Sequence, residues 1–395
     1  NVNGITATVG GDATITNSGT FNGNSIQAVD DTIVSSGGDV TGGSINSGSV
    51  TVASTGGSIF DFGAAAVGGL VTGNASLTAS VDINGADVSA VENVTFLAGS
   101  NIIGGSVSAG TIDPADPLVP TSDGNVTLTA TAGSIDGVDV FAANLAADVV
   151  TLNAGVDIIG GSIDALNDVT LLNTVGDVSG IELNVGGDLT IGDGTDTVNV
   201  NGITATVGND VTITNSGWTT GNEINAVGTT AITTTLDITG GSINSGTVTV
   251  ESTVGSIFDL GGVALNGPAS LTAFRDINGV DFSALTNVTF LAGNNIVGGS
   301  VSSGLINPAS LGTVTVVATG GSIVDLDIFA TDDANLLAGM NISGGTIEAG
   351  DQVTLDNTTG DVTGVNVDAA SLLIGTDPNT LGTDTVNVVG VNANV

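Results

Sequence analysis

Short runs of alternating apolar and polar residues recur along the whole chain, with no helical segment between them. Each run reads apolar, Thr, apolar, and Gly, Asn, Asp and Ser separate successive runs, as turns require. Because successive side chains of a strand point to opposite faces, this pattern predicts short strands with apolar residues inside and Thr outside. The clearest runs are Val50–Val52, Val94–Phe96, Val126–Leu128, Val169–Leu171, Val211–Ile213, Val288–Phe290 and Val353–Leu355.

A second phrase lies between these runs and consists of Asp, Asn or Ser, then Ile or Val, often followed by Gly-Gly-Ser and another Ile or Val. We take the first Ile or Val as the anchor of one structural repeat. Most anchors are 19–24 residues apart; two spacings are 14, and the longest (135 − 102) is 33. The anchors are Val2, Ile26, Val40, Ile59, Ile83, Ile102, Ile135, Ile158, Val178, Val200, Ile224, Ile238, Ile257, Ile277, Ile296, Ile323, Ile342, Val362 and Val388.

This period predicts an all-β fold, a right-handed parallel β-helix (β-solenoid) of about 18 coils with roughly 19–24 residues each. A propeller blade needs about twice that length, and the Leu/Asn signature of leucine-rich repeats is missing. Coils stacked at ~4.8 Å would make a rod roughly 85–90 Å long. Val, Ile, Leu and Phe are expected inside, with Thr51, Thr95 and Thr127 in a column outside.

A longer repeat encloses the short one. Residues 1–60 and 199–258 share 41 identities without gaps. We therefore divide the chain into residues 1–198, residues 199–386 and the start of a third repeat at 387–395, all within one continuous solenoid. The proline-rich segment Thr111–Gly124 is longer than its counterpart in the second repeat and is expected to be an exposed loop.

The composition excludes several classes of function. With 40 acidic residues against one Lys or Arg, the formal net charge is −39, so binding to nucleic acid or to an anionic membrane is not expected. The hydrophobic content of 41% argues against disorder and places the charge on a folded surface. No apolar stretch approaches the ~20 residues of a membrane span, and Cys is absent.

An enzymatic function is not expected either. The chain has no His, Lys, Tyr or Cys to act as a base, and its five Glu form no paired motif. Arg275 is the only basic side chain; it stands before Asp276 and is expected to form a local ion pair with an acidic neighbour. A negatively charged surface would also repel a polyuronate substrate.

Acidic residues precede many of the anchors, and this position is the candidate metal site. Stacked coils would place these side chains ~4.8 Å apart. Asp157 and Asp177, in adjacent coils, are the best pair, because a bridging Ca²⁺ would relieve their repulsion. In the alternative interpretation, Asp and Asn are turn formers whose side chains bond along the stack. We expect no required cofactor, and Ca²⁺ is the cation that this position would bind.

The segments Asn125–Ile135 (NVTLTATAGSI) and Asp168–Val178 (DVTLLNTVGDV) resemble the repeats of filamentous haemagglutinin-type exoproteins. Those proteins are large bacterial surface fibres and adhesins exported by two-partner secretion. The resemblance covers nearly every coil and implies a secreted, cell-surface protein.

We therefore expect a structural segment of an extracellular bacterial fibre or adhesin stalk. The alternative is a polysaccharide-binding or -cleaving β-helix, with cell-surface polysaccharide as its partner. The chain starts and stops in nearly the same phase, since Thr385–Val388 restates Thr197–Val200. Open strand edges pair with other chains, so either copies of this chain stack head to tail or the chain belongs to a longer tandem protein.

Overall fold

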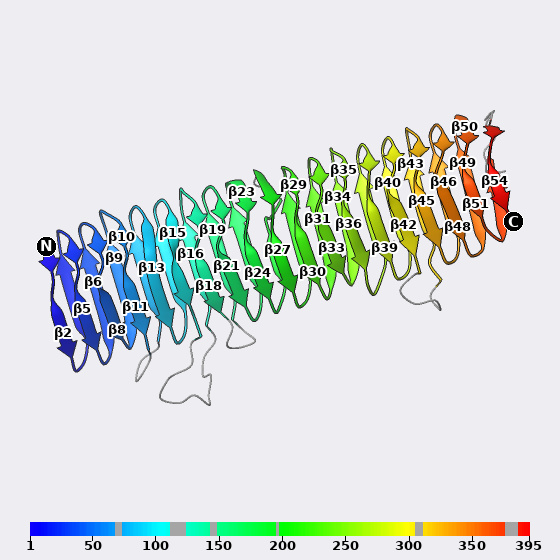
Figure 1. The fold of residues 1–395 in the computed structure, drawn as a ribbon. Helices are drawn as coiled ribbons and strands as arrows, with labels where there is room; N and C mark the ends of the chain where they lie inside the picture. Colours follow the sequence, from blue (N-terminus) through cyan, green and yellow to red (C-terminus); the bar gives the residue numbers. More distant parts are fainter. Residues whose placement is uncertain (68–72, 111–123, 143–147, 195–196, 305–310, 376–385) are drawn as a thin grey trace. The chain divides into compact units, whose positions relative to one another are not determined.

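The computed structural model describes residues 1–67, 73–110, 124–142, 148–194, 197–304, 311–375 and 386–395 (Figure 1). Contacts divide the chain into two compact units, Asn1–Asn209 and Asp210–Val395. Their boundary lies shortly after the start of the second long repeat at Asn199, and the division of the sequence at residues 198 and 386 stays a prediction. Residues 111–123 of the expected loop are outside the described part of the chain.

Every regular element in the described residues is a β-strand, and the strands of successive coils pair in parallel. Each coil contributes to three ladders of strands, which we call ribbons 1, 2 and 3 in chain order. In the first unit, β2, β5 and β8 lie side by side in this way (Figure 1). The predicted parallel β-solenoid of about 18 coils is therefore confirmed over the described residues of the two units.

The first unit contains strands β1 to β27, of which β13 and β15 run through both ribbon 1 and ribbon 2. Ribbon 1 consists of β1 (Val2–Asn3), β4 (Phe21–Asn22), β7 (Val40–Thr41), β10 (Ile59–Phe60), β13 (Ile83–Ala90), β15 (Ile102–Ser108), β17 (Ile135–Asp136), β20 (Ile158–Ile159), β23 (Val175–Ser179) and β26 (Thr197–Asn201). Ribbon 2 adds β2 (Thr6–Val9), β5 (Ser25–Ala28), β8 (Ser44–Ser47), β11 (Gly63–Ala66), β18 (Asp139–Ala142), β21 (Ser162–Ala165), β24 (Glu182–Val185) and β27 (Thr204–Val207). Ribbon 3 consists of β3 (Ala13–Asn17), β6 (Asp31–Ser36), β9 (Ser49–Ser54), β12 (Ala75–Ala79), β14 (Val94–Ala98), β16 (Val126–Ala130), β19 (Val150–Ala154), β22 (Val169–Asn173) and β25 (Leu189–Ile191).

The second unit repeats the arrangement with strands β28 to β54. Ribbon 1 consists of β29 (Thr219–Thr220), β32 (Ile238–Thr239), β35 (Ile257–Phe258), β38 (Ile277–Asn278), β41 (Ile296–Val297), β44 (Ile323–Val324), β47 (Ile342–Ser343), β50 (Gly360–Thr363) and β53 (Val386–Val389). Ribbon 2 consists of β30 (Glu223–Ala226), β33 (Ser242–Ser245), β36 (Gly261–Ala264), β39 (Asp281–Ala284), β42 (Ser300–Ser303), β45 (Asp327–Ala330), β48 (Thr346–Ala349), β51 (Asn366–Asp368) and β54 (Asn392–Asn394). Ribbon 3 consists of β28 (Val211–Asn215), β31 (Thr229–Thr234), β34 (Thr247–Ser252), β37 (Ala269–Ala273), β40 (Val288–Ala292), β43 (Val314–Ala318), β46 (Ala334–Ala338), β49 (Gln352–Asn357) and β52 (Ser371–Ile374).

The alternating pattern of ribbon 3 places its side chains as predicted. Val50 and Val52 are buried, whereas Thr51 between them is exposed. Through Ser76 of β12, the Thr51 position stacks on Thr95 and then on Thr127, so the outer column exists. Burial of the apolar residues is the main source of stability, at roughly 25 cal/mol for each Å² removed from water.

Two of the predicted anchors are wrong. Phe21 pairs with Val2 and Val40 in ribbon 1, while Ile26 pairs with Ala7 and Ile45 in ribbon 2. In the second unit, Thr219 pairs with Ile238, and Ile224 pairs with Ile243 of ribbon 2. The anchor spacings of 14 residues therefore disappear; around Phe21 both spacings (21 − 2 and 40 − 21) are 19. The two predictions failed because an inward apolar residue of ribbon 2 has the same local sequence pattern as an anchor of ribbon 1.

The Gly-Gly phrase forms the corner between ribbons 1 and 2. Gly160 has a φ of 61°, in the left-handed region that favours glycine. Asp61, Asp259 and Asp325 occupy the equivalent corner in other coils, with φ of 48°, 51° and 51°. The second glycine, Gly161, also has positive φ, and a Cβ there would overlap the carbonyl oxygen of Val138 in the preceding coil.

Candidate functional site

The residue that precedes each inward residue of ribbon 1 is polar in every described coil except that of Trp218, and these residues form one column in each unit, which we call the turn column. In the first unit its members are Asn1, Thr20, Asp39, Ser58, Asp82, Asn101, Ser134, Asp157, Asp177 and Asn199. In the second unit they are Trp218, Asp237, Ser256, Asp276, Asn295, Ser322, Asn341, Asp361 and Asn387.

Hydrogen bonds run along the turn column from coil to coil. The Oδ1 atom of Asp82 accepts the backbone N–H and the side-chain Nδ2–H of Asn101, at 2.9 and 3.0 Å. In the second unit, Asp276 accepts the same two bonds from Asn295, at 2.9 and 3.1 Å. Each carboxylate thus satisfies a backbone donor that the corner leaves out of the strand ladder, and bonds to charged acceptors are the stronger kind.

Asp157 and Asp177 are adjacent in the turn column, as the sequence predicted, and both are half-buried. Asp157 Oδ1 accepts the backbone N–H of Asp177 at 2.8 Å, and Asp177 Oδ1 accepts the Asn199 Nδ2–H at 2.7 Å. They are the one pair of acids in consecutive positions among the described residues of this column. Asp157 Oδ2 also accepts the Ser134 Oγ–H at 3.5 Å, so hydrogen bonds engage both oxygens of Asp157 and one oxygen of Asp177. The pair offers few of the 6–8 oxygens that Ca²⁺ takes. The calcium site stays a prediction.

The exposed first positions of the ribbon 2 strands form a second polar column, and over part of the first unit acids alternate in it with serine. In the first unit its order includes Asp87, Ser106, Asp139, Ser162 and Glu182. Ser162 donates to Asp139 Oδ1 from its backbone N–H at 3.0 Å and from its Oγ at 2.7 Å. The alternation places like charges about 9.6 Å apart, whereas acids in adjacent coils would be ~4.8 Å apart. The larger distance is close to the screening length at physiological salt, so the repulsion is weak.

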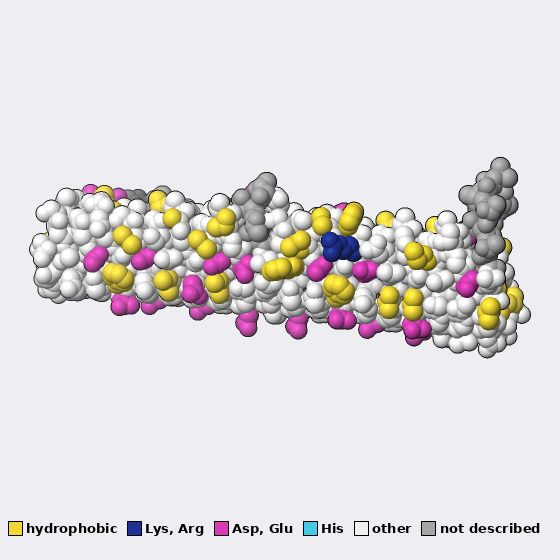
Figure 2. Space-filling view, turned by 90° about the horizontal axis from the view of Figure 1, so that it is seen from above, with side chains coloured by type: hydrophobic (Ala, Val, Ile, Leu, Met, Phe, Trp, Pro, Cys, Tyr) yellow, Lys and Arg dark blue, Asp and Glu magenta, His cyan; other side chains and the backbone are white. Residues whose placement is uncertain are grey.

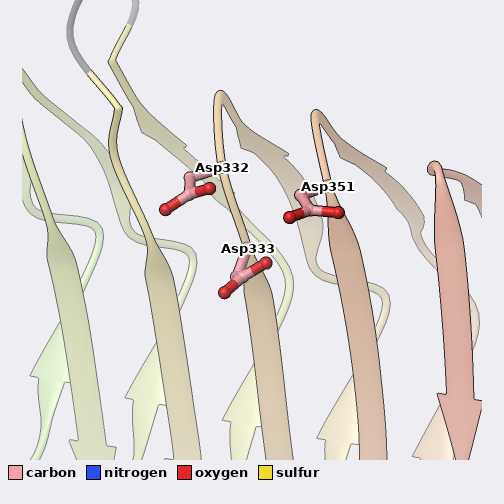
Figure 3. A group of neighbouring side chains, drawn as sticks. All are labelled: Asp332, Asp333 and Asp351. Atoms are coloured by element: carbon pink, nitrogen blue, oxygen red, sulfur yellow. The ribbon is translucent and has the colours of Figure 1, made fainter.

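Three carboxylates gather on neighbouring coils of the second unit. Asp332 and Asp333 precede β46, and Asp351 precedes β49 (Figure 3). One oxygen of each lies within 4.8 Å of the others, and Asp333 Oδ1 also accepts the Gln352 N–H at 3.1 Å. Carboxylate oxygens of this kind suit a hard divalent cation. This trio was not predicted from the sequence; the available signal was an Asp pair followed by another Asp 19 residues later (351 − 332).

The one basic side chain lies on the rim of an open depression in the second unit. The depression has a volume of about 530 Å³, and its lining includes Glu251, Phe274, Arg275 and Asn294. Within the described part of the chain, the Arg275 guanidinium makes no ion pair and no hydrogen bond, so the predicted ion pair is wrong. In Figure 2 this side chain, in dark blue, stands among separate hydrophobic and acidic side chains.

Comparison of the chain with protein-family models, with curated proteins and with solved structures finds no match. The resemblance to filamentous haemagglutinin-type repeats therefore rests on the residues quoted above. Among the described residues, no helix is long and apolar enough to cross a bilayer.

Proposed function

We propose that this chain is a non-enzymatic structural segment of an extracellular bacterial fibre or adhesin stalk. The observation that carries the proposal is the turn column, in which the side chain of one coil bonds the backbone of the next. The acidic side chains of this column thus join each coil to the next.

The way in which coils are joined supports a mechanical role. Backbone hydrogen bonds connect each coil to its neighbours on three ribbons, and buried residues such as Leu77, Phe96 and Leu128 stack between coils. In a stack of this kind each repeat contacts its neighbours, so stability adds up along the stack. Such a stack can be extended by further coils whose strands pair in the same register, either from another copy of the chain or from another part of a longer chain.

The acidic surface supports a role outside the cell in the presence of salt and divalent cations. A net charge of −39 keeps such segments soluble and opposes side-by-side association. Cations that bind between acidic side chains, with Ca²⁺ at Asp157 and Asp177 as the predicted case, would reduce this repulsion along the stack.

Immunogold electron microscopy of the source bacterium tests the proposal, with antibodies raised against residues 1–395. We expect label on extended fibres at the cell surface, and filaments of the purified chain in negative stain. Label confined to the cell interior, together with strictly monomeric particles, would overturn the proposal.

A polysaccharide-binding function is the second candidate, and the depression beside Phe274 is the observation that favours it. Binding need not compete with a stalk function, because the depression lies at the ends of ribbon 3 strands of the second unit and over the turns that follow them.

A further inference from the structure

The depression at Phe274 combines an exposed aromatic ring with charged and polar groups. Phe274 is 63% exposed and Leu291 is 39% exposed. Glu251, Arg275 and Asn294 contribute a carboxylate, a guanidinium and an amide to the same lining. These groups supply both hydrogen-bond donors and acceptors around an apolar platform.

Arg275 is unpaired although the chain has 40 acidic residues. Its five N–H donors point to no protein acceptor in the described residues, so they are available to a ligand. A large exposed aromatic residue beside free donors is an unusual surface feature, since isolated apolar exposure is common but such combinations mark binding sites.

The two long repeats provide an internal comparison. Thr78, Leu97 and Thr131 of the first unit correspond to Thr272, Leu291 and Thr319 of the depression, so the outline is common to both units. Four neighbouring positions differ: Glu251, Phe274, Arg275 and Asn294 stand where the first unit has Ala53, Ser80, Val81 and Ser100. Each change introduces a larger side chain, and three of them add a charge or an amide group. All four of these residues of the second unit line the depression.

We propose that this depression binds a neutral, hexose-based glycan. A pyranose ring packs on Phe274, the Arg275 guanidinium donates hydrogen bonds to sugar oxygens, and Glu251 accepts them from hydroxyl groups. Asn294 does both. The volume of about 530 Å³ lies within the range of small-ligand sites.

The charge of the chain selects a neutral ligand over an acidic one. Glu251 lies in the lining, and the surrounding surface carries a large negative charge, so a polyuronate would be repelled. A neutral glycan meets no such repulsion and still uses both charged side chains. The inference does not rest on the fibre proposal, because it concerns the separate chain in solution.

An array of neutral and acidic oligosaccharides, probed with the labelled chain, tests the inference, followed by titration of the strongest neutral glycan. We expect binding to neutral glycans and at least a tenfold loss in the double variant Phe274→Ser/Arg275→Val. That variant carries the residues of the first unit at the same place in the coil, so the fold should be retained, which circular dichroism checks.

Phe141→Ser removes an exposed Phe (44%) from the first unit and serves as the matched control, with binding unchanged. Arg275→Lys should weaken binding less than Arg275→Val, because one donor group remains. Absence of binding to every neutral glycan, binding to acidic glycans alone, or equal binding by the folded double variant would overturn the inference.

Discussion

The Oδ1 atom of Asp157 accepts a hydrogen bond from the backbone N–H of Asp177, one coil further along, at 2.8 Å. This hydrogen bond joins two acidic residues whose negative charges repel each other. The side chain before the anchor therefore accepts a hydrogen bond from the backbone of the next coil, with or without a bound cation.

Asp157→Asn should therefore leave the column intact, because the amide oxygen is an equivalent acceptor without the charge. Asp157→Ala should destabilise the coil by about 1–2 kcal/mol, the cost of losing a bond to a charged acceptor and leaving the donor unsatisfied. Hydrogen exchange at the Asp177 amide measures this directly. Equal exchange in the Asn and Ala variants would contradict the role of the side chain.

Removal of Ca²⁺ by a chelator, at matched ionic strength, should lower the melting temperature of the wild-type chain, because like charges in adjacent coils then repel. Asp177→Asn should reduce this effect if the predicted pair binds the ion. Asp351→Asn serves as the comparison, since it removes one oxygen of the Asp332, Asp333 and Asp351 trio. Identical melting with and without chelator would refute calcium binding and leave the fibre proposal standing.

Ile158→Asp should cost several kcal/mol, because Ile158 is 1% exposed and stacks between Ile135 and Val178. The loss of hydrogen-exchange protection should centre on the neighbouring coils. Thr170→Ser, on the outer column, is the control and should change the free energy of unfolding very little. A tolerated Asp at position 158 would be incompatible with the observed packing.

The adjacent glycines of the corner should differ in their tolerance of Ala. Gly160→Ala meets a positive φ but only ordinary contacts, with backbone atoms of Gly137 at 3.9 Å, so we expect a loss of about 1–2 kcal/mol. Gly161→Ala meets a positive φ and the carbonyl oxygen of Val138, so the loss should be larger. Urea denaturation of the two variants in parallel makes the comparison, and the reverse order would contradict the assigned corner geometry.

Local rules are sufficient for the strands and their two faces. The alternation at Val50, Thr51 and Val52 requires only that side chains of a strand point in opposite directions, and it was predicted correctly. The same rules identified Asp157 and Asp177 as neighbours, because the spacing of coils there is regular. They were insufficient at Phe21 and Thr219, where an anchor is filled by a residue outside the Ile/Val pattern.

By itself the sequence determined the fold class, the direction of the apolar side chains and the acidic surface, since each depends on period and composition. Tertiary structure alone decided the register between coils and which side chains of neighbouring coils lie next to each other on the surface. Asp332 and Asp351 come together, and Phe274 shares a depression with Glu251 and Asn294, because stacking places residues about one coil apart within reach of each other. Coil length varies through insertions, so sequence separation does not specify which side chains become neighbours.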